Sequence, residues 1–169
     1  MLKSNIALIG MMGCGKSSVA QILAKRLKRD VFSTDKMLEA KEGATIADIF
    51  MDKGEVYFRN LEKSVVKDVC GKQNAVIDCG GGVIIDPENR RLLKQSAVLF
   101  YLSASPEFLY SKIEGNRDRP LLQVSDPVGK LRDLLSRRKS FYKEADHEVV
   151  SEGRTVHEIT DEIVKIIKI

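Results

Sequence analysis

The sequence lacks the features that mark membrane-spanning, secreted and nucleic-acid-binding chains. No apolar run reaches the roughly 18 residues that a membrane-spanning helix needs, and the first residues do not have the layout of a secretory signal peptide. The chain has only three cysteines, without the spacing of metal ligands, which favours free thiols and a cytoplasmic location. No long run of like charges occurs, and the net charge of +4 is dispersed. We therefore expect neither a membrane nor nucleic acid as a partner.

The composition is that of a folded globular protein. Hydrophobic residues make up 43% of the 169 residues and charged residues 31%. This length fits a single domain over residues 1–169 with one sizeable core, without repeats or linkers, and we expect a monomer. The mild positive charge suits an anionic substrate held in a cleft.

Short apolar runs alternate with longer amphipathic stretches along the chain. Strands are expected at residues 5–9, 31–34, 75–79, 97–102 and 148–151. Helices are expected at residues 16–28, 45–52, 55–71, 86–94, 105–113, 127–145 and 156–167. This alternation predicts a three-layer α/β/α fold with a five-stranded parallel sheet covered on both faces. Ligands bind such sheets at the carboxyl ends of the strands, so residues 10–17, 34–35 and 78–82 should share one edge.

Residues 10–17 read Gly-Met-Met-Gly-Cys-Gly-Lys-Ser and match the phosphate-loop pattern G-x-x-x-x-G-K-[ST]. Glycines let the chain wrap closely around an anion, and the loop N–H groups with the following helix N-terminus bind phosphates. Lys16 would add charge at the β- and γ-phosphates, and the Ser17 hydroxyl would ligate Mg²⁺. We therefore predict ATP binding through Gly13, Cys14, Gly15, Lys16, Ser17 and Ser18. A glycine-rich turn without a ligand is the alternative, and the short chain favours a small kinase over a motor or switch.

Two aspartates follow strands at the same expected edge. Asp35, with Thr34, is expected to close the second strand, where it would orient an acceptor hydroxyl or take its proton. Capping a helix N-terminus is an equal alternative for Asp35. Asp78 ends the third strand, where it would help to hold magnesium or simply cap the strand end.

Further candidates lie on the expected helix 55–71 and after the third strand. Arg59 and Glu62 are three residues apart and share a helix face, so they can form a pair. The paired Arg59 guanidinium could recognise a carboxylate of the substrate. Taken alone, however, this pair is better interpreted as an ordinary surface ion pair. The three glycines at 80–82 indicate a close approach of backbone to a ligand, or a flexible turn.

The segment at residues 114–126 is polar and irregular, and it carries Arg117 and Arg119. An arginine-bearing lid would exclude water and stabilise charge that develops on a transferred phosphate, whereas a solvated loop is the alternative. Arg137 and Arg138 follow on the next helix and could reach the same cleft.

In their order and spacing, these motifs resemble the shikimate kinase family, in the nucleoside-monophosphate-kinase-like branch of phosphate-loop proteins, over essentially the whole chain. The resemblance is carried by residues 10–17, Ala47-Asp48-Ile49-Phe50, Thr34-Asp35, Phe58-Arg59 with Glu62, Gly80-Gly81-Gly82, Arg119-Pro120-Leu121-Leu122 and the stretch from Arg138 to Tyr142. It implies an enzyme of aromatic amino-acid biosynthesis that transfers the γ-phosphate of ATP to the 3-hydroxyl of shikimate.

The resemblance also implies roles for the acceptor side. Asp35 would bind the shikimate hydroxyls and act as base or orienting group. Arg59 and Arg138 would clamp the carboxylate, and the backbone at Gly81 and Gly82 would contact the ring substituents.

The remaining implied parts concern the nucleotide. The substrate-binding region would span about 33–62 and the mobile lid about 114–126, where Arg119 would reach the ATP phosphates as a catalytic residue beside Lys16. Arg154 falls where the adenine-side loop of the family lies.

The chain departs from the family pattern at three positions. Ser33 stands where the first carboxylate of an Asp-x-Asp pair is usual, and Asp78 stands where Ser, Ala or Thr is usual. We hypothesise that Asp78 takes over the magnesium role lost at Ser33. Ser140 replaces a proline close to Arg138. A gluconate-kinase-like enzyme and a catalytically inactive ligand-binding relative are the alternative functions.

Overall fold

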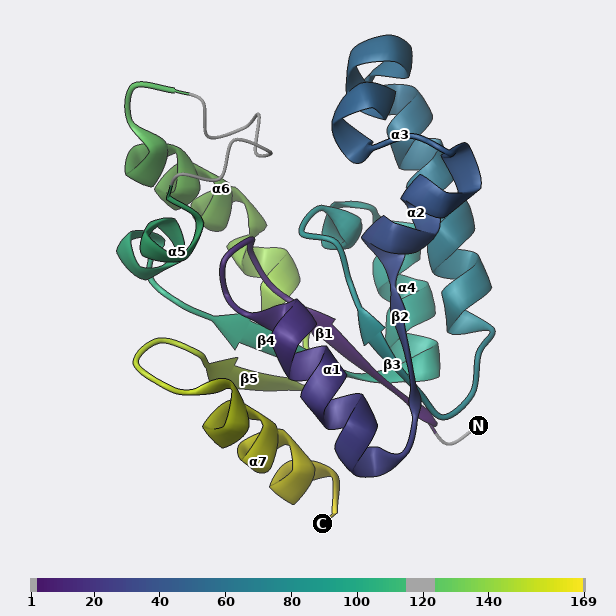
Figure 1. The fold of residues 1–169 in the computed structure, drawn as a ribbon, viewed down its shortest axis with the longest axis vertical. Helices are drawn as coiled ribbons and strands as arrows, with labels where there is room; N and C mark the ends of the chain where they lie inside the picture. The colour runs from purple at the N-terminus through teal and green to yellow at the C-terminus, as the bar shows by residue number, and fades with distance from the viewer. Residues whose placement is uncertain (1–2, 115–123, 169) are drawn as a thin grey trace.

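The computed structural model describes residues 3–114 and 124–168 and has the predicted α/β architecture (Figure 1). Its sheet contains β1 (Asn5–Ile9), β2 (Asp30–Ser33), β3 (Ala75–Asp78), β4 (Ala97–Ser103) and β5 (His147–Val150). The strand order is β2-β3-β1-β4-β5, and every neighbouring pair is parallel. Every residue of β1 and β3 is buried, which is why these strands are apolar except for Asn5 and Asp78 at their ends.

Helices cover both faces of this sheet. They are α1 (Lys16–Leu27), α2 (Thr34–Glu42), α3 (Ile46–Cys70), the 3₁₀ turn η1 (Val83–Ile85), α4 (Pro87–Ser96), α5 (Pro106–Ile113), α6 (Pro127–Tyr142) and α7 (Val156–Ile167). The chain crosses the sheet in one direction from β1 to β2 and in the other direction at every later crossover, so right-handed connections place α1 opposite α3, α4 and α6. The last helix, α7, packs beside α1 (Figure 1).

Helix α2 was not predicted, and it corrects the expectation for Thr34 and Asp35. Strand β2 ends at Ser33, which is the N-cap residue of α2, so Thr34 and Asp35 lie in the first helical turn. Asp35 therefore neither closes a strand nor caps a helix. The helix is short and mostly polar, and it packs against α3 with Leu38 buried between them. This tertiary contact stabilises a helix whose own sequence signal is weak.

The two helices expected at 45–52 and 55–71 form the single element α3, with a break at Gly54. Gly54 has φ 78° and ψ 174°, a conformation that glycine adopts without steric cost. The predicted boundary between the two helices thus corresponds to a local interruption. Along the described residues, no helix is both long enough and apolar enough to cross a bilayer.

Candidate functional site

The phosphate loop joins the end of β1 to the start of α1, as predicted. Gly15 is the N-cap of α1 at φ 89°, and Gly13 has φ 84°. A Cβ added at Gly13 would lie 2.6 Å from the carbonyl oxygen of Leu109 on α5, so no larger residue fits there. Cys14 is buried beneath the loop, while Ser17 and Ser18 are exposed at the first turn of α1. The six predicted phosphate-contacting residues therefore surround one helix N-terminus, which favours an anion.

Lys16 is buried, with 8% of its surface exposed, and its side chain folds back over the loop. Its Nζ donates to the carbonyl oxygen of Met11 at 2.9 Å and lies 3.6 Å from the Cys14 Sγ. Neither contact neutralises the ammonium charge. A negatively charged ligand on the loop would do so, which is the role that the motif assigns to this lysine.

Ser17 and Asp78 meet at the edge of the sheet. The Ser17 hydroxyl donates to Asp78 Oδ2 at 2.7 Å across 61 residues of sequence. Asp78 ends β3 and pairs in register with Ser33 on β2. Its carboxylate therefore lies beside Ser33, the position at which the family pattern usually has an aspartate. Oxygen atoms of this kind suit a hard cation such as Mg²⁺. Over the described residues, no cluster of three or more His, Cys, Asp or Glu residues could hold a metal ion.

The glycines at 80–82 form a loop, called the glycine floor below, at the place where the sequence predicts the acceptor side. Gly80 N–H donates to the Thr34 hydroxyl at 2.8 Å, and a Cβ added at Gly80 would overlap the Asp35 carboxylate. A Cβ added at Gly82 would lie 2.5 Å from Arg59 Nη1. These close approaches place the ends of the Asp35 and Arg59 side chains directly over the loop, so a larger residue at Gly80 or Gly82 would displace them.

Arg138 approaches the same loop from α6. Its Nη1 donates to the Gly81 carbonyl at 2.9 Å, and the residue is only 7% exposed. Its neighbour Arg137 faces solvent with a 74% exposed side chain and pairs with Asp133 on its own helix. The expectation that Arg137 could also reach the cleft is therefore wrong in this arrangement, because the two side chains leave α6 on different faces.

Arg59 is held by two carboxylates of α3. Its Nη1 lies 2.9 Å from Glu62 Oε2, and its Nη2 lies 3.4 Å from Glu55 Oε1. Glu62 is 2% exposed, so the reading as a surface ion pair is wrong. Burial raises the pKa of the Glu62 carboxyl, and the Arg59 guanidinium opposes that rise.

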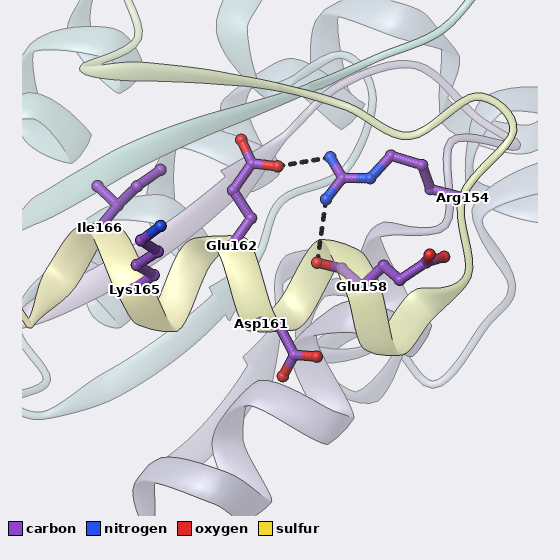
Figure 2. A pocket seen from close by; sticks show the side chains of 6 residues that line it. All are labelled: Arg154, Glu158, Asp161, Glu162, Lys165 and Ile166. Atoms are coloured by element: carbon purple, nitrogen blue, oxygen red, sulfur yellow. Dashed lines mark hydrogen bonds and ion pairs between the residues drawn. The ribbon is translucent and has the colours of Figure 1, made fainter.

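Arg154 lies in the turn between β5 and α7, and its guanidinium is directed along α7 (Figure 2). Its Nη1 pairs with Glu162 Oε2 at 2.6 Å, and its Nη2 donates to the Glu158 carbonyl at 3.1 Å (Figure 2). Nη1 also donates to the Val150 carbonyl at 3.1 Å. These contacts fasten the turn to α7. The adenine-side role of Arg154 stays a prediction.

Other predicted parts fall differently. Arg117 and Arg119 lie outside the described residues, as does most of the expected lid at 114–126. The sequence reading missed the role of Thr34, whose hydroxyl anchors Gly80. A hydroxyl residue directly before the candidate Asp35 was the available signal, but its partner is 46 residues away and local pattern cannot identify it.

Comparisons with known proteins identify the family to which this chain belongs. The family profile described as "Shikimate kinase" matches residues 12–168. The shikimate kinase of Dehalococcoides mccartyi is 39% identical over 96% of this chain and 92% of its own length. The solved structure of "Shikimate kinase from Acinetobacter baumannii in complex with shikimate" has a TM-score of 0.94 and 36% identity, covering 98% of this chain and 93% of that one.

A gluconokinase from Sinorhizobium meliloti covers 96% of this chain and 90% of its own, with a TM-score of 0.58 and 15% identity, and therefore shares the fold alone. The phosphate loop, the glycine floor and the residues converging on them occur in a chain that matches one family along nearly its whole length. The chain belongs to the shikimate kinase family.

Proposed function

We propose that this protein transfers the γ-phosphate of ATP to the 3-hydroxyl of shikimate, giving shikimate 3-phosphate and ADP. The observation that carries the proposal is the convergence of Asp35, Arg59 and Arg138 on the glycine floor beside the phosphate loop. These three residues come from three different helices, so the arrangement is a product of the fold. A related structure with 36% identity is described in complex with shikimate, which supports this acceptor.

The two arginines suit the shikimate carboxylate. Arg138 is buried and Arg59 is largely buried, so a carboxylate between them would be shielded from water, where charge-assisted hydrogen bonds are stronger. The backbone of Gly81 and Gly82 would contact the ring substituents. An added Cβ at Gly81 would have no heavy atom closer than 3.9 Å, whereas at Gly82 the Arg59 guanidinium occupies that space. Such a clamp favours an acceptor that carries a carboxylate over a neutral polyol.

Asp35 would fix the reacting hydroxyl. A carboxylate at the end of the glycine floor accepts a hydrogen bond from an acceptor hydroxyl, orients its oxygen for in-line attack and takes its proton as the phosphoryl group is transferred. Holding the two reactants in line supplies much of the rate enhancement in phosphoryl transfer.

On the nucleotide side, the loop N–H groups and Lys16 would hold the phosphates, and Arg119 would reach them from the lid. Mg²⁺ would bind through Ser17, with Asp78 holding a metal-bound water, and when bound it neutralises charge on the phosphates. The fit rests on the 2.7 Å contact between Ser17 Oγ and Asp78 Oδ2. Mg²⁺ commonly binds through few protein oxygens together with waters and phosphates, which matches this sparse donor set.

Release of ADP in a coupled assay, with shikimate, with gluconate and with neither, tests the proposed function. Release that depends on shikimate supports it. Release that depends on gluconate would favour the gluconate-kinase-like alternative, and ATP binding without turnover would favour the inactive relative.

The same proposal includes a single-domain cytoplasmic monomer, with Arg154 on the adenine side. Analytical ultracentrifugation with and without ATP measures the oligomeric state directly. A dimer under both conditions would overturn the monomer.

A further inference from the structure

Arg90 makes contacts that none of the proposed substrate or nucleotide roles uses. It lies on α4, and its Nη1 donates to the carbonyls of Ile84 at 2.7 Å and Ile85 at 3.0 Å. The preceding residue, Asn89, donates its Nδ2 to the Val83 carbonyl at 3.1 Å. All three carbonyls of η1 therefore accept hydrogen bonds from α4 side chains. A turn this short cannot satisfy those carbonyls by itself, so the two α4 residues fix its position.

The same guanidinium reaches the end of α6. Arg90 Nε pairs with Glu144 Oε1 at 3.0 Å, and the guanidinium carbon lies 4.3 Å from the centre of the Phe141 ring. Phe141 is in the last turn of α6, and Glu144 lies two residues beyond the end of this helix. A planar guanidinium can stack on a ring and use its edge for hydrogen bonds at the same time, which an ammonium cannot do. Arg90 thus joins η1 to the C-terminal end of α6.

These two segments also carry the acceptor side. Arg138 precedes Phe141 by about one helical turn and donates to the Gly81 carbonyl, just before η1. Gly82 is the N-cap of η1, and a Cβ there would lie only 2.5 Å from Arg59 Nη1. The two arginines come from α3 and α6, and the 80–82 loop lies against both side chains. Small shifts of η1 relative to α6 would therefore change how this loop positions the guanidinium groups of the proposed clamp.

We propose that Arg90 is a positioning residue for the acceptor site, which holds the 80–82 loop at the distance from α6 at which Arg59 and Arg138 bind the same carboxylate. This inference rests on the proposed function. Its effect should fall mainly on the acceptor, because Arg90 itself contacts only η1 and the end of α6 among the described contacts. The link to the phosphate loop is indirect and weaker, through Arg138 Nη1 at 3.5 Å from the Met11 Sδ.

The test compares Arg90→Met with Arg91→Met. Arg91 is the matched control, because its side chain is 52% exposed and its partners Glu88 and Gln95 both lie on α4. Misplacing a group that positions the substrate by about 1 Å lowers the efficiency with that substrate by up to about 100-fold. We therefore expect Arg90→Met to raise the shikimate KM between roughly tenfold and 100-fold. The ATP KM should change by less than about twofold, and Arg91→Met should leave both constants unchanged. Calorimetric titration with shikimate in the absence of nucleotide should show the same loss.

Two milder variants keep the test decisive if Arg90→Met does not fold. Arg90→Lys should give an intermediate shikimate KM, because a lysine retains one carbonyl contact but not the stacked geometry. Glu144→Gln should raise the shikimate KM by about two- to fivefold through the partly exposed end of the link.

The outcomes separate this inference from the proposed function. A wild-type protein without shikimate-dependent ADP release would overturn the proposed function. An active wild type whose Arg90 variants change both KM values equally, or lower only the melting temperature, would overturn the positioning role.

Discussion

Replacing Arg59 with alanine should damage both stability and acceptor binding, and a second substitution should separate the two. Removing Arg59 leaves Glu62 as a buried carboxylate without its partner at 2.9 Å. Breaking a fully buried pair costs about 3–5 kcal/mol. Since the Arg59 side chain is 23% exposed, we expect about 2–3 kcal/mol, or a fall in Tm of about 4–12 °C for a chain of this length. Loss of a bidentate contact to the carboxylate should raise the shikimate KM about 100-fold.

The stability part of this prediction depends on pH. Burial already raises the pKa of Glu62 above its ordinary value of 4.5, and loss of the guanidinium raises it further. A carboxyl with a raised pKa in the folded state contributes stability that is complete below its unfolded pKa and is lost as the pH rises through the folded pKa. The deficit of Arg59→Ala should therefore be larger at about pH 8 than at about pH 5.

The double variant Arg59→Ala/Glu62→Gln is the control. It leaves no buried charge, so it should recover most of the lost Tm at about pH 8, while the shikimate KM stays high. Melting curves at the two pH values and steady-state kinetics measure both effects. The buried-charge explanation fails if the double variant melts as low as Arg59→Ala, and the clamp fails if the ATP KM rises as much as the shikimate KM.

Three further substitutions test other parts of the site. Asp78→Asn should raise the Mg²⁺ concentration that gives half-maximal rate about tenfold, and calorimetry should show the same weakening of Mg²⁺-dependent ATP binding. An unchanged Mg²⁺ dependence would contradict the role of Asp78. Gly80→Ala places a methyl group on the Asp35 carboxylate and should raise the shikimate KM at least about tenfold. Gly71→Ala is the control, because its added Cβ would make only ordinary contacts, and it should leave the shikimate KM unchanged. Equal KM values for the two variants would refute the close packing of Asp35 on the glycine floor. Arg154→Met should lower stability by about 1–2 kcal/mol through its lost contacts to α7 and should raise the ATP KM, and an unchanged ATP KM would leave it a structural role alone.

Sequence and fold contributed different parts of the acceptor site. The sequence alone made Arg59 and Glu62 neighbours on one helix face, but their burial came from the packing around α3, and this turned an apparent surface pair into a shielded one. Likewise, helix spacing alone allowed both Arg137 and Arg138 to reach the cleft, and the family resemblance assigned the clamp to Arg138. The fold gives the physical reason, because α6 directs Arg138 to the glycine floor and Arg137 to solvent.

The sequence by itself determined the phosphate loop and the sheet that carries it. Both depend on residues that are close together in the chain. The loop depends on its glycines and Lys16 within residues 10–17, and the buried strands depend on short apolar runs. Helix α2 was not predicted from the sequence, because its stability comes from packing on α3 and not from its own composition.

The sequence predicted that residues 10–17 and 78–82 lie at one edge of the sheet, but only the tertiary structure decided which side chains from distant segments meet. Ser17 and Asp78 are 61 residues apart, and Gly81 and Arg138 are 57 apart, yet each pair forms a direct hydrogen bond. The parallel strand order brings the ends of β1, β2 and β3 to one edge, and the helix crossovers return Arg59 and Arg138 over it. Such contacts follow from how the layers close on one another, which local residue patterns do not encode.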